Sequence, residues 1–342
     1  MKRSIFKSMM LVLVLLIVFA APLIASNGNA IPEMKFEDIL GLSVAGIVIN
    51  AANLAALYKN FKTIFNDAYS AATPMYPDIA MEVPSSAEVE VYAWMGSFPK
   101  MREWIGDRVI ANLKAMTWSI TNKDWEATVS VPRNKILFDT YGVFKPIIQS
   151  MGFAARCHPD ELVAGLLNDG MTALCYDGKA FFATTHDVGG SNYSNKGTGV
   201  FSDTTLTAGL AAIKGVKNDK GQPLGIGSNG KITLVVPPAL EYKARLYLFA
   251  AQISGTDNVL KGACELQVNP FLNSDVKWYL IAEHNGLKPL VFQNAKTPEF
   301  LGPDDPANAE AAKMKKEYIY GVDSIDNAGY GLWQLAYGST GA

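Results

Sequence analysis

The longest regular hydrophobic pattern in this chain lies between residues 139 and 170. Apolar or small residues recur there in steps of three or four, which is the spacing of one face of an amphipathic helix. Pro146 suits the first turn of such a helix, because the N–H that proline lacks would have no intrahelical partner there. Asp169 and Gly170 suit a left-handed C-terminal end. The predicted apolar face carries Phe144, Ile148, Met151, Ala155, His158, Leu162 and Leu166, widened by Ile147, Ala154, Val163 and Leu167.

Pro159 lies in the middle of this predicted helix and should kink or break it. The hydrophobic pattern nevertheless keeps its phase across the proline, which favours one bent helix over two unrelated ones. A helix of about 25 residues, rising about 1.5 Å per residue, would be roughly 37 Å long. Since the mean helix has only about 11 to 12 residues, we expect this one to be the spine of the fold.

A second amphipathic helix is predicted to begin at Asn50 or Asn53, either of which can cap it, and to continue to about Tyr69. Its polar face is not rich in lysine. Docking on its own chain or on a neighbouring subunit is therefore a better interpretation than membrane binding. The apolar face carries Leu54, Leu57, Tyr58, Phe61, Ile64 and Phe65, and the polar face carries Lys59, Lys62 and Asp67.

Two stretches of alternating apolar and polar residues, 88–95 and 124–131, predict half-buried strands. The long segment between them lacks helical periodicity over most of its length, and such excursions are uncommon unless they are functional. Two interpretations fit it. It is either an arm that packs on another subunit through aromatic and arginine anchors, or a small subdomain that folds back on its own chain. The candidate contact residues are Trp94, Lys100, Arg102, Trp104, Asp107, Arg108 and Trp118.

From residue 171 to about 265, predicted helices and strands alternate, which indicates a compact α/β or α+β domain. Farther along, turn-forming residues between alternating runs predict two hairpins. The domain should contain a helix at 205–216, a buried strand at 231–236 and a helix that ends near Gln252. The hairpins should join 276–283 to 287–294 across His284-Asn285-Gly286, and 316–325 to 329–338 across Asp326-Asn327-Ala328.

The composition limits the possible classes of protein. With 342 residues, 49% hydrophobic and 18% charged, the chain can bury a sizeable core in one elaborated domain or in two. Its formal net charge of −2 leaves no basic surplus for sequence-specific recognition of nucleic acid. A protein that encloses nucleic acid without gripping it is still allowed. Cys157, Cys175 and Cys264 are widely spaced and form no Cys-x-x-Cys pair, which argues against a disulfide framework and a structural zinc site.

Residues 1–33 conflict with the rest of the chain. Three basic residues precede an apolar run and a small-residue site at 28–30, as in a secretory signal peptide. The apolar run is short for a transmembrane span. Either the start codon is wrongly chosen and Met34 or a nearby residue is the real N-terminus, which we favour, or the extension is genuine.

Candidate catalytic chemistry is sparse. The Gly-x-Gly-x-x-Gly motif at 225–230 is followed by a strand, so no helix N-terminus would hold a phosphate there. His186 and Asp187 could form a base with an orienting carboxylate, and Cys175 could be a nucleophile. No glycine-bracketed nucleophile or cysteine at a helix start accompanies them. We therefore predict no enzyme activity and no catalytic, cofactor-binding or metal-binding residues.

Five blocks of the sequence resemble the major head subunits of Mu-like phages and prophages, the gpT-type major capsid proteins. They are INAANLAALYKNFKTIFNDAY from Ile49, YAWMGSFPKMREWIGDRVIANL from Tyr92, HPDELVAGLLNDG from His158, CYDGKAFFATTH from Cys175 and KEYIYGVDSIDNAGYGLWQLAYGSTGA from Lys316. The resemblance runs from about residue 47 to the end. It is specific, because several long and unusual blocks occur in the right order.

The resemblance implies an α+β chain with the tailed-phage major capsid fold, named for phage Hong Kong 97. After the signal-like extension (1–33), it implies an N-terminal arm with an amphipathic helix (34–87) and an extended loop (88–132). The spine helix of the peripheral domain (133–170), the axial domain (171–270) and the returning strands of the peripheral domain (271–342) then follow. In this family the extended loop lies across a neighbouring subunit, which favours the inter-subunit arm for the tryptophan-rich segment.

The resemblance also implies a structural role. The subunit would assemble with itself, as hexamers and pentamers, into an icosahedral virion shell in the cytoplasm of the bacterial host. A scaffolding protein and a portal are expected partners, and the shell would enclose double-stranded DNA non-specifically. No small-molecule substrate, cofactor or membrane is expected for the mature form. Two alternatives stay open: a secreted enzyme or binding protein behind the signal-like segment, and a nanocompartment shell with enzyme cargo.

Overall fold

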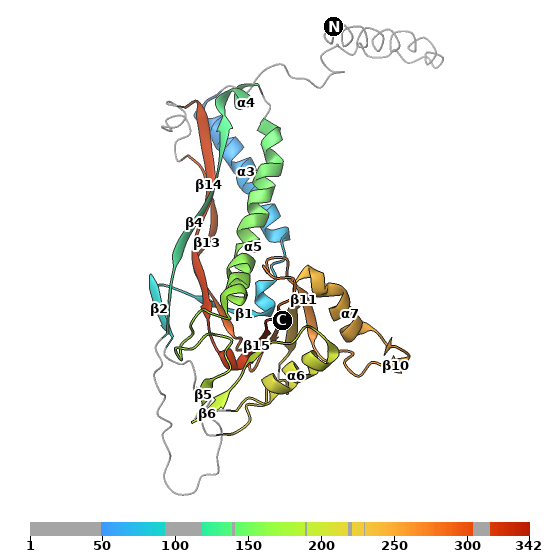
Figure 1. Cartoon of the computed structure of the whole chain (residues 1–342). Helices are drawn as coiled ribbons and strands as arrows, with labels where there is room; N and C mark the ends of the chain where they lie inside the picture. Colours follow the sequence, from blue (N-terminus) through green and yellow to red (C-terminus); the bar gives the residue numbers. More distant parts are fainter. Residues whose placement is uncertain are drawn as a thin grey trace, which may run out of the picture. The chain divides into compact units, whose positions relative to one another are not determined.

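The computed structural model describes residues 49–92, 118–138, 141–188, 190–217, 221–228, 230–303 and 315–342. All of them belong to one compact unit that begins at Ile47. A long four-stranded sheet, a five-stranded sheet and the helices that cover them form this unit (Figure 1). No helix in these ranges combines the length and the hydropathy that a membrane span needs.

The four-stranded sheet is long and narrow because it is built around extended antiparallel strands. Strand β14 (Glu317–Tyr330) lies between β13 (Leu290–Leu301) and β4 (Lys123–Pro132) and is antiparallel to both. The short strand β1 (Ala80–Pro84) runs parallel to β13 on its other side. The strand predicted at 124–131 is therefore confirmed.

Helix α3 (Ala51–Ala71) packs on this sheet through the apolar face that the sequence predicted. Asn50 caps it, because the side-chain oxygen accepts a hydrogen bond from the Asn53 N–H at 2.8 Å. Phe61 meets Tyr320 of β14 edge to face, with ring centroids 5.2 Å apart. The helix thus docks on its own chain, one of the two alternatives considered. Its buried residues are Leu54, Leu57, Phe61, Phe65 and Ala68.

Helix α5 (Lys145–Asp169) is continuous over 25 residues and contains Pro159, as predicted. Pro146 lies in its first turn, after the 3-10 helix η3 (Tyr141–Phe144). Gly170 has a φ of −60°, in the right-handed region, so the predicted left-handed end is wrong. The helix therefore ends without the backbone reversal that a glycine makes possible.

Beyond Pro159, the buried face of α5 is rotated relative to the apolar face that the sequence predicted. Leu162 and Leu166 are only half-buried. The first half of the helix faces α3 and the long sheet, whereas the second half faces the five-stranded sheet, and a different set of side chains points to each. The buried residues of α5 are Ile148, Met151, Gly152, Pro159, Asp160, Val163, Ala164 and Leu167.

Asp160 ties the middle of α5 to the segment that follows α3. The residue is 3% exposed, and its Oδ1 accepts hydrogen bonds from the N–H groups of Met75 and Tyr76 at 2.8 and 2.6 Å. Burial raises the pKa of Asp160, and these two hydrogen bonds oppose the rise. The donors lie at the start of the 3-10 helix η2 (Tyr76–Asp78), where backbone N–H groups lack partners inside the helix.

The five-stranded sheet is buried on both faces. Helices α6 (Asp203–Lys214) and α7 (Glu241–Phe249) pack on one face, where their buried side chains belong to the same core cluster as Leu234 of β8. The second half of α5 packs on the other face, where Leu167 joins the cluster of Val235. In order, the strands are β11 (Glu265–Val268), β8 (Ile232–Val236), β12 (Trp278–Ala282), β15 (Ala336–Ser339) and β7 (Lys196–Gly197).

The helix predicted at 205–216, the buried strand predicted at 231–236 and the helix after it are confirmed as α6, β8 and α7. The two predicted hairpins are wrong. Strands β12 and β13 flank the turn at 284–286 but belong to different sheets, and only an isolated bridge between His284 and Leu287 closes the turn. Residues 326–328 lie inside β14 and pair with β4 or β13. Long-range pairing therefore overrides the local turn chemistry at both places.

We predict opposite effects for two glycine substitutions in α5. A Cβ at Gly152 would lie 2.6 Å from the backbone oxygen of Phe65 in α3, whereas one at Gly165 would have nothing within 4 Å. Gly152→Ala should destabilise the chain by about 1–3 kcal/mol because α3 must move. Gly165→Ala should stabilise it by about 0.5–1 kcal/mol through helix propensity. Urea unfolding of both variants measures this, and effects of the same sign would contradict the close contact between the two helices.

Candidate functional site

The tryptophan-rich segment leaves and re-enters the fold at neighbouring positions. Strands β2 (Val89–Tyr92) and β3 (Trp118–Thr121) form an antiparallel pair, whose register places Tyr92 opposite Trp118. We call this pair the arm stem. Trp118 is half-buried, and its ring packs against core residues of its own chain. Residues 93–117, and with them the candidate contact residues Trp94, Lys100, Arg102, Trp104, Asp107 and Arg108, lie outside the described residues.

The arm stem is fastened to β13 of the long sheet through Gln293, which is fully buried. Its Oε1 accepts a hydrogen bond from the Tyr92 hydroxyl at 2.9 Å. Its Nε2 donates to Asn122 Oδ1 at 2.6 Å and to the Ile120 carbonyl at 3.3 Å. Burial, aided by the charge of Glu90, raises the pKa of Tyr92 to about 12, so the phenol stays a donor at neutral pH. The base of the segment thus has a fixed position.

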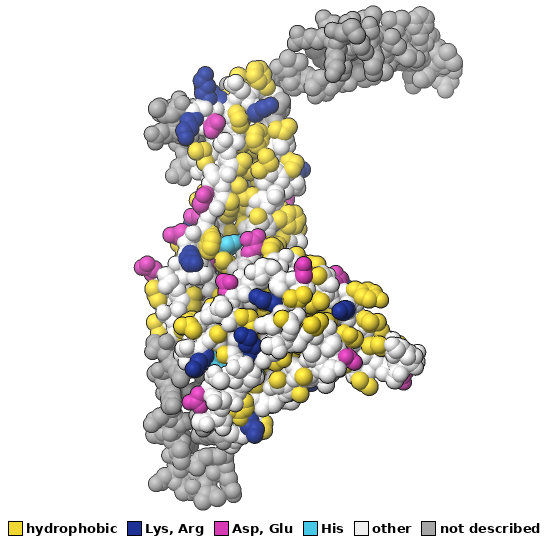
Figure 2. Space-filling view, viewed as in Figure 1, with side chains coloured by type: hydrophobic (Ala, Val, Ile, Leu, Met, Phe, Trp, Pro, Cys, Tyr) yellow, Lys and Arg dark blue, Asp and Glu magenta, His cyan; other side chains and the backbone are white. Residues whose placement is uncertain are grey.

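Large apolar side chains are exposed close together in two places. The first is at the α4 end of the long sheet, where α4 (Arg133–Leu137) leads into α5 (Figures 1 and 2). The second lies on α7, where Tyr242 is 78% exposed and Phe249 is 53% exposed, and these two residues share one helix face. The first surface includes Leu137, Phe138, Val143, Ile147 and Phe153.

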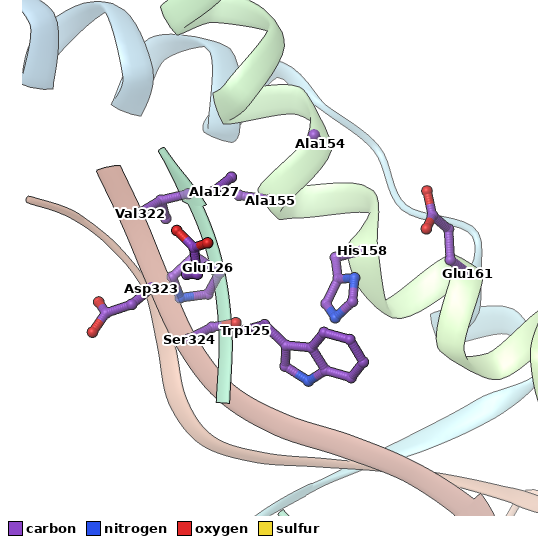
Figure 3. Close-up of a pocket in the computed structure, with 11 residues that line it drawn as sticks. Trp125, Glu126, Ala127, Ala154, Ala155, His158, Glu161, Val322, Asp323 and Ser324 are labelled. Atoms are coloured by element: carbon purple, nitrogen blue, oxygen red, sulfur yellow. The ribbon is translucent and has the colours of Figure 1, made fainter. Parts of the chain in front are cut away.

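A pocket of about 180 Å³ lies between α5 and the strands β4 and β14 (Figure 3). Trp125 and His158 face each other in it, with ring centroids 4.5 Å apart. His158 Nε2 lies 3.7 Å from Oδ1 of the buried Asp326. Burial raises the pKa of Asp326, whereas a hydrogen bond from Ser324 and the nearby His158 oppose the rise. The Ser324 hydroxyl therefore donates to the Asp326 carboxylate and not to the His158 imidazole. A nucleophilic serine would need a hydrogen bond to the imidazole.

A second polar cluster is buried beside the C-terminal segment. His186 Nδ1 lies 2.5 Å from Asp177 Oδ2, and the Cys175 thiol donates to Asp177 Oδ1 at 3.0 Å. The imidazole stacks on Trp333, with ring centroids 3.9 Å and planes 8° apart. Burial tends to raise the pKa of Asp177, but the hydrogen bonds from His186 and Cys175 outweigh it and hold that pKa below its ordinary value.

The pairing of His186 with Asp187 that the sequence suggested is not formed. Asp187 is exposed and accepts a hydrogen bond from the Gly190 N–H at 3.0 Å. Cys175 is also badly placed to be a nucleophile, because burial and the hydrogen bond to Asp177 raise the pKa of its thiol far above the ordinary value. A reactive cysteine needs a lowered pKa and a base in contact with the thiol. The Cys175 thiol and the His186 imidazole each pair with Asp177, which is not the thiol-to-imidazole contact of a Cys–His hydrolase.

The glycines of the 225–230 motif all have positive φ and form the turns that precede β8, as the sequence indicated. The described residues form a long sheet with a helix along it, a second compact sheet, and a two-stranded stem that is fastened to the long sheet. This is the architecture of a shell subunit of the tailed-phage capsid class, in which function resides in contacts between copies.

Comparison with known proteins agrees with this class. The family model of the Mu-like prophage major head subunit gpT matches residues 54–205, 192–272 and 273–342. The chain is 32% identical over 286 residues to the Mu-like prophage FluMu major head subunit of Haemophilus influenzae, which covers 84% of this chain and 72% of that protein. It is 28% identical over 293 residues to the major capsid protein of Escherichia phage Mu, with 85% and 74% covered. This chain belongs to the Mu-like major head subunit family.

Solved structures confirm the fold. The procapsid subunit of bacteriophage JBD30 matches with a TM-score of 0.55 and 32% identity, over 85% of this chain and 76% of that one. The capsid subunit of cyanophage P-SCSP1u matches with a TM-score of 0.51 at 10% identity, over 78% and 88%, which shows a shared fold alone. The predicted tailed-phage capsid fold and the role of a structural capsid subunit are thereby confirmed.

Sequence reasoning missed the residues that hold the buried cluster together. Asp177 lies in an Asp-Gly turn and Asn195 in a run of glycine, serine and asparagine, and neither position carries a recognisable motif. A signal existed, since a buried histidine needs partners for both ring nitrogens. The sequence could not show which of the many acidic and amide residues would supply them.

We predict that Gln293→Leu loosens the arm stem more than Tyr92→Phe does. The leucine removes the partner of three hydrogen-bonding groups, of which the Tyr92 hydroxyl and the Ile120 carbonyl are buried, at a cost of about 2–4 kcal/mol. The phenylalanine removes one hydrogen bond worth about 1 kcal/mol. Urea unfolding and the rate of limited proteolysis within residues 93–117 measure the two effects. Equal stability of the two variants would show that Gln293 does not fasten the stem.

Proposed function

We propose that this subunit assembles with copies of itself, as hexamers and pentamers, into a closed icosahedral shell around double-stranded DNA. Residues 93–117 act in this assembly as an arm that lies across a neighbouring subunit. The observation that carries the proposal is the arm stem, because both ends of the segment are fixed at one place on the long sheet. A segment anchored in this way can reach outward while its own subunit stays folded.

The composition of the arm supports a protein partner. Trp94, Trp104, Arg102 and Arg108 are residue types that dominate the centres of protein interfaces. A shell also needs head-to-tail contacts that close into rings, in which one surface of a subunit meets a different surface of the next. The exposed apolar surface on α7 and the one at the α4 end of the long sheet supply two such different surfaces on one chain.

We propose that the domain division follows the two sheets. The peripheral domain holds the long sheet with α3 and α5, and the axial domain holds the five-stranded sheet with α6 and α7. The segment 271–342 contributes to both, since β13 and β14 belong to the first sheet, whereas β12 and β15 pair with each other in the second. Family membership supports assembly in the bacterial cytoplasm with a scaffolding protein and a portal.

Electron microscopy of residues 34–342 expressed in a bacterial cytoplasm tests self-assembly. We expect rings, tubes or closed shells, and co-expression with a scaffolding protein from the same phage should shift the products toward closed shells. The alternative, a secreted protein behind the signal-like segment, predicts a monomer whose mature chain begins near Ile31. Mass spectrometry of the product of the full chain distinguishes the two, and monomers in every condition would overturn the shell.

We predict that shortening the arm between Lys100 and Arg108 blocks assembly but not folding. The described part of the chain packs its core without this segment, so the melting temperature should fall by no more than about 2 °C, an effect below 1 kcal/mol. A matched control replaces the same number of residues with glycine and serine, keeping length but removing the anchors. Normal shells from both variants would contradict the proposal that residues 93–117 contact a neighbouring subunit.

A further inference from the structure

The buried cluster of Cys175, Asp177 and His186 brings together three side chains of the kinds that bind transition metals. Their sulfur, carboxylate oxygen and ring nitrogen all lie within 4.8 Å of one another. Cys175 and Asp177 come from the turn after α5, which closes when the Cys175 N–H bonds to the Lys179 carbonyl at 2.8 Å. His186 begins strand β5 (His186–Val188). The sequence showed no such grouping, because the motif is neither Cys-x-x-Cys nor His-x-x-x-His.

Asn195 decides which nitrogen of His186 faces the cluster. The Asn195 amide orientation is fixed, because its Oδ1 accepts from the Ala183 N–H at 2.9 Å and its Nδ2 donates to the Phe181 carbonyl at 2.8 Å. This Oδ1 lies 3.2 Å from His186 Nε2, so Nε2 must carry a proton. In metal sites a histidine ligand is oriented in the same way, through a hydrogen bond from its other nitrogen.

The other ring nitrogen of His186, Nδ1, therefore faces the Asp177 carboxylate. Without a proton or a metal ion between them, the lone pair of Nδ1 would point at a carboxylate oxygen. A nitrogen lone pair and a carboxylate oxygen 2.5 Å apart would repel each other in a site that excludes water. A proton can occupy this position, and so can a metal ion. The Cys175 thiol also places a proton against this carboxylate, because it donates to the other oxygen, Oδ1. Two protons thus converge on Asp177.

We propose that Cys175, Asp177 and His186 bind one thiophilic divalent cation of the zinc class in exchange for these two protons. The hydrogen-bonded cluster contains a thiol, a carboxylate and an imidazolium, so its charge is zero. The metal-bound cluster contains a thiolate, a carboxylate, a neutral imidazole and a charge of +2, so its charge is also zero. The exchange places no net charge in the core, which removes the main cost of burying an ion.

Asp177 is the ligand that can adjust to the larger ion. Zinc bound to nitrogen and oxygen at about 2.0–2.2 Å requires these ligand atoms to be roughly 3.3 Å apart, so the carboxylate has to withdraw by about 1 Å. Asp177 keeps 10% of its side chain exposed and precedes Gly178, which has open space around it, whereas Cys175 and His186 are buried. The turn is therefore the side from which an ion would enter the cluster.

The consequence of binding is structural. The metal would tie the turn after α5 to the start of β5, whose His186 stacks on Trp333. This inference does not depend on the proposed assembly, since it concerns contacts within one chain. It amends the expectation of no metal-binding residues that the sequence gave.

Titration of the purified full chain with Cd²⁺ after removal of metals by a chelator tests the proposal. We expect a thiolate-to-metal charge-transfer band in the ultraviolet that saturates at one equivalent per chain, with release of about two protons per ion in a weakly buffered solution. Zn²⁺ should compete for the same site and raise the melting temperature. No band in the wild-type chain would overturn the proposal.

The other two cysteines are matched controls. Cys157→Ser combined with Cys264→Ser should keep the full band, since neither residue belongs to the cluster. Cys175→Ser should weaken Cd²⁺ binding about tenfold or more, although serine can still donate to Asp177 and keep the fold. If Cys175→Ser does not fold, the double variant alone decides. Loss of the band in that variant would mean that Cd²⁺ binds only at the other thiols.

Discussion

The structure depends on the packing of α5 against two different sheets. Its first half fills the core between α3 and the long sheet, and its second half closes one face of the five-stranded sheet. Strand β14 also contributes to both cores. Tyr320 lies in the core shared with α3, and Tyr330 lies in the core beside the five-stranded sheet. One helix and one strand thus connect the two parts through buried side chains.

This shared packing explains the features at the middle of α5. Pro159 removes one helical hydrogen bond, and the buried face changes direction beyond it. A buried carboxylate at the next position would be costly without partners, yet Asp160 has two backbone donors that need an acceptor. The proline and the aspartate therefore lie where the helix passes from one core to the other, and they attach the chain after α3 to that point.

The polar groups in the core are organised for structure. Gln293 fastens the arm stem, and Asn195 orients His186, each through several hydrogen bonds to buried partners. Such networks are strong when every member is satisfied and costly when one is removed. They fix the position of the arm stem and of Trp333 in the C-terminal segment. A shell subunit needs this rigidity, because errors in the angle between neighbours accumulate around a ring.

Elements with local signals were predictable from the amino-acid sequence. Helical periodicity predicted α3 and α5, alternation predicted β4, and long blocks in the right order indicated the Mu-like head subunit family. The pairing of strands became visible only in the folded chain, since β12 and β13 separate into two sheets despite a turn between them, and residues 326–328 stay inside β14. The folded chain also brings Cys175, Asp177 and His186 together. Local patterns report propensity over a few residues, whereas pairing and buried polar contacts depend on residues far apart in the chain, and their energies outweigh the preference of any single turn.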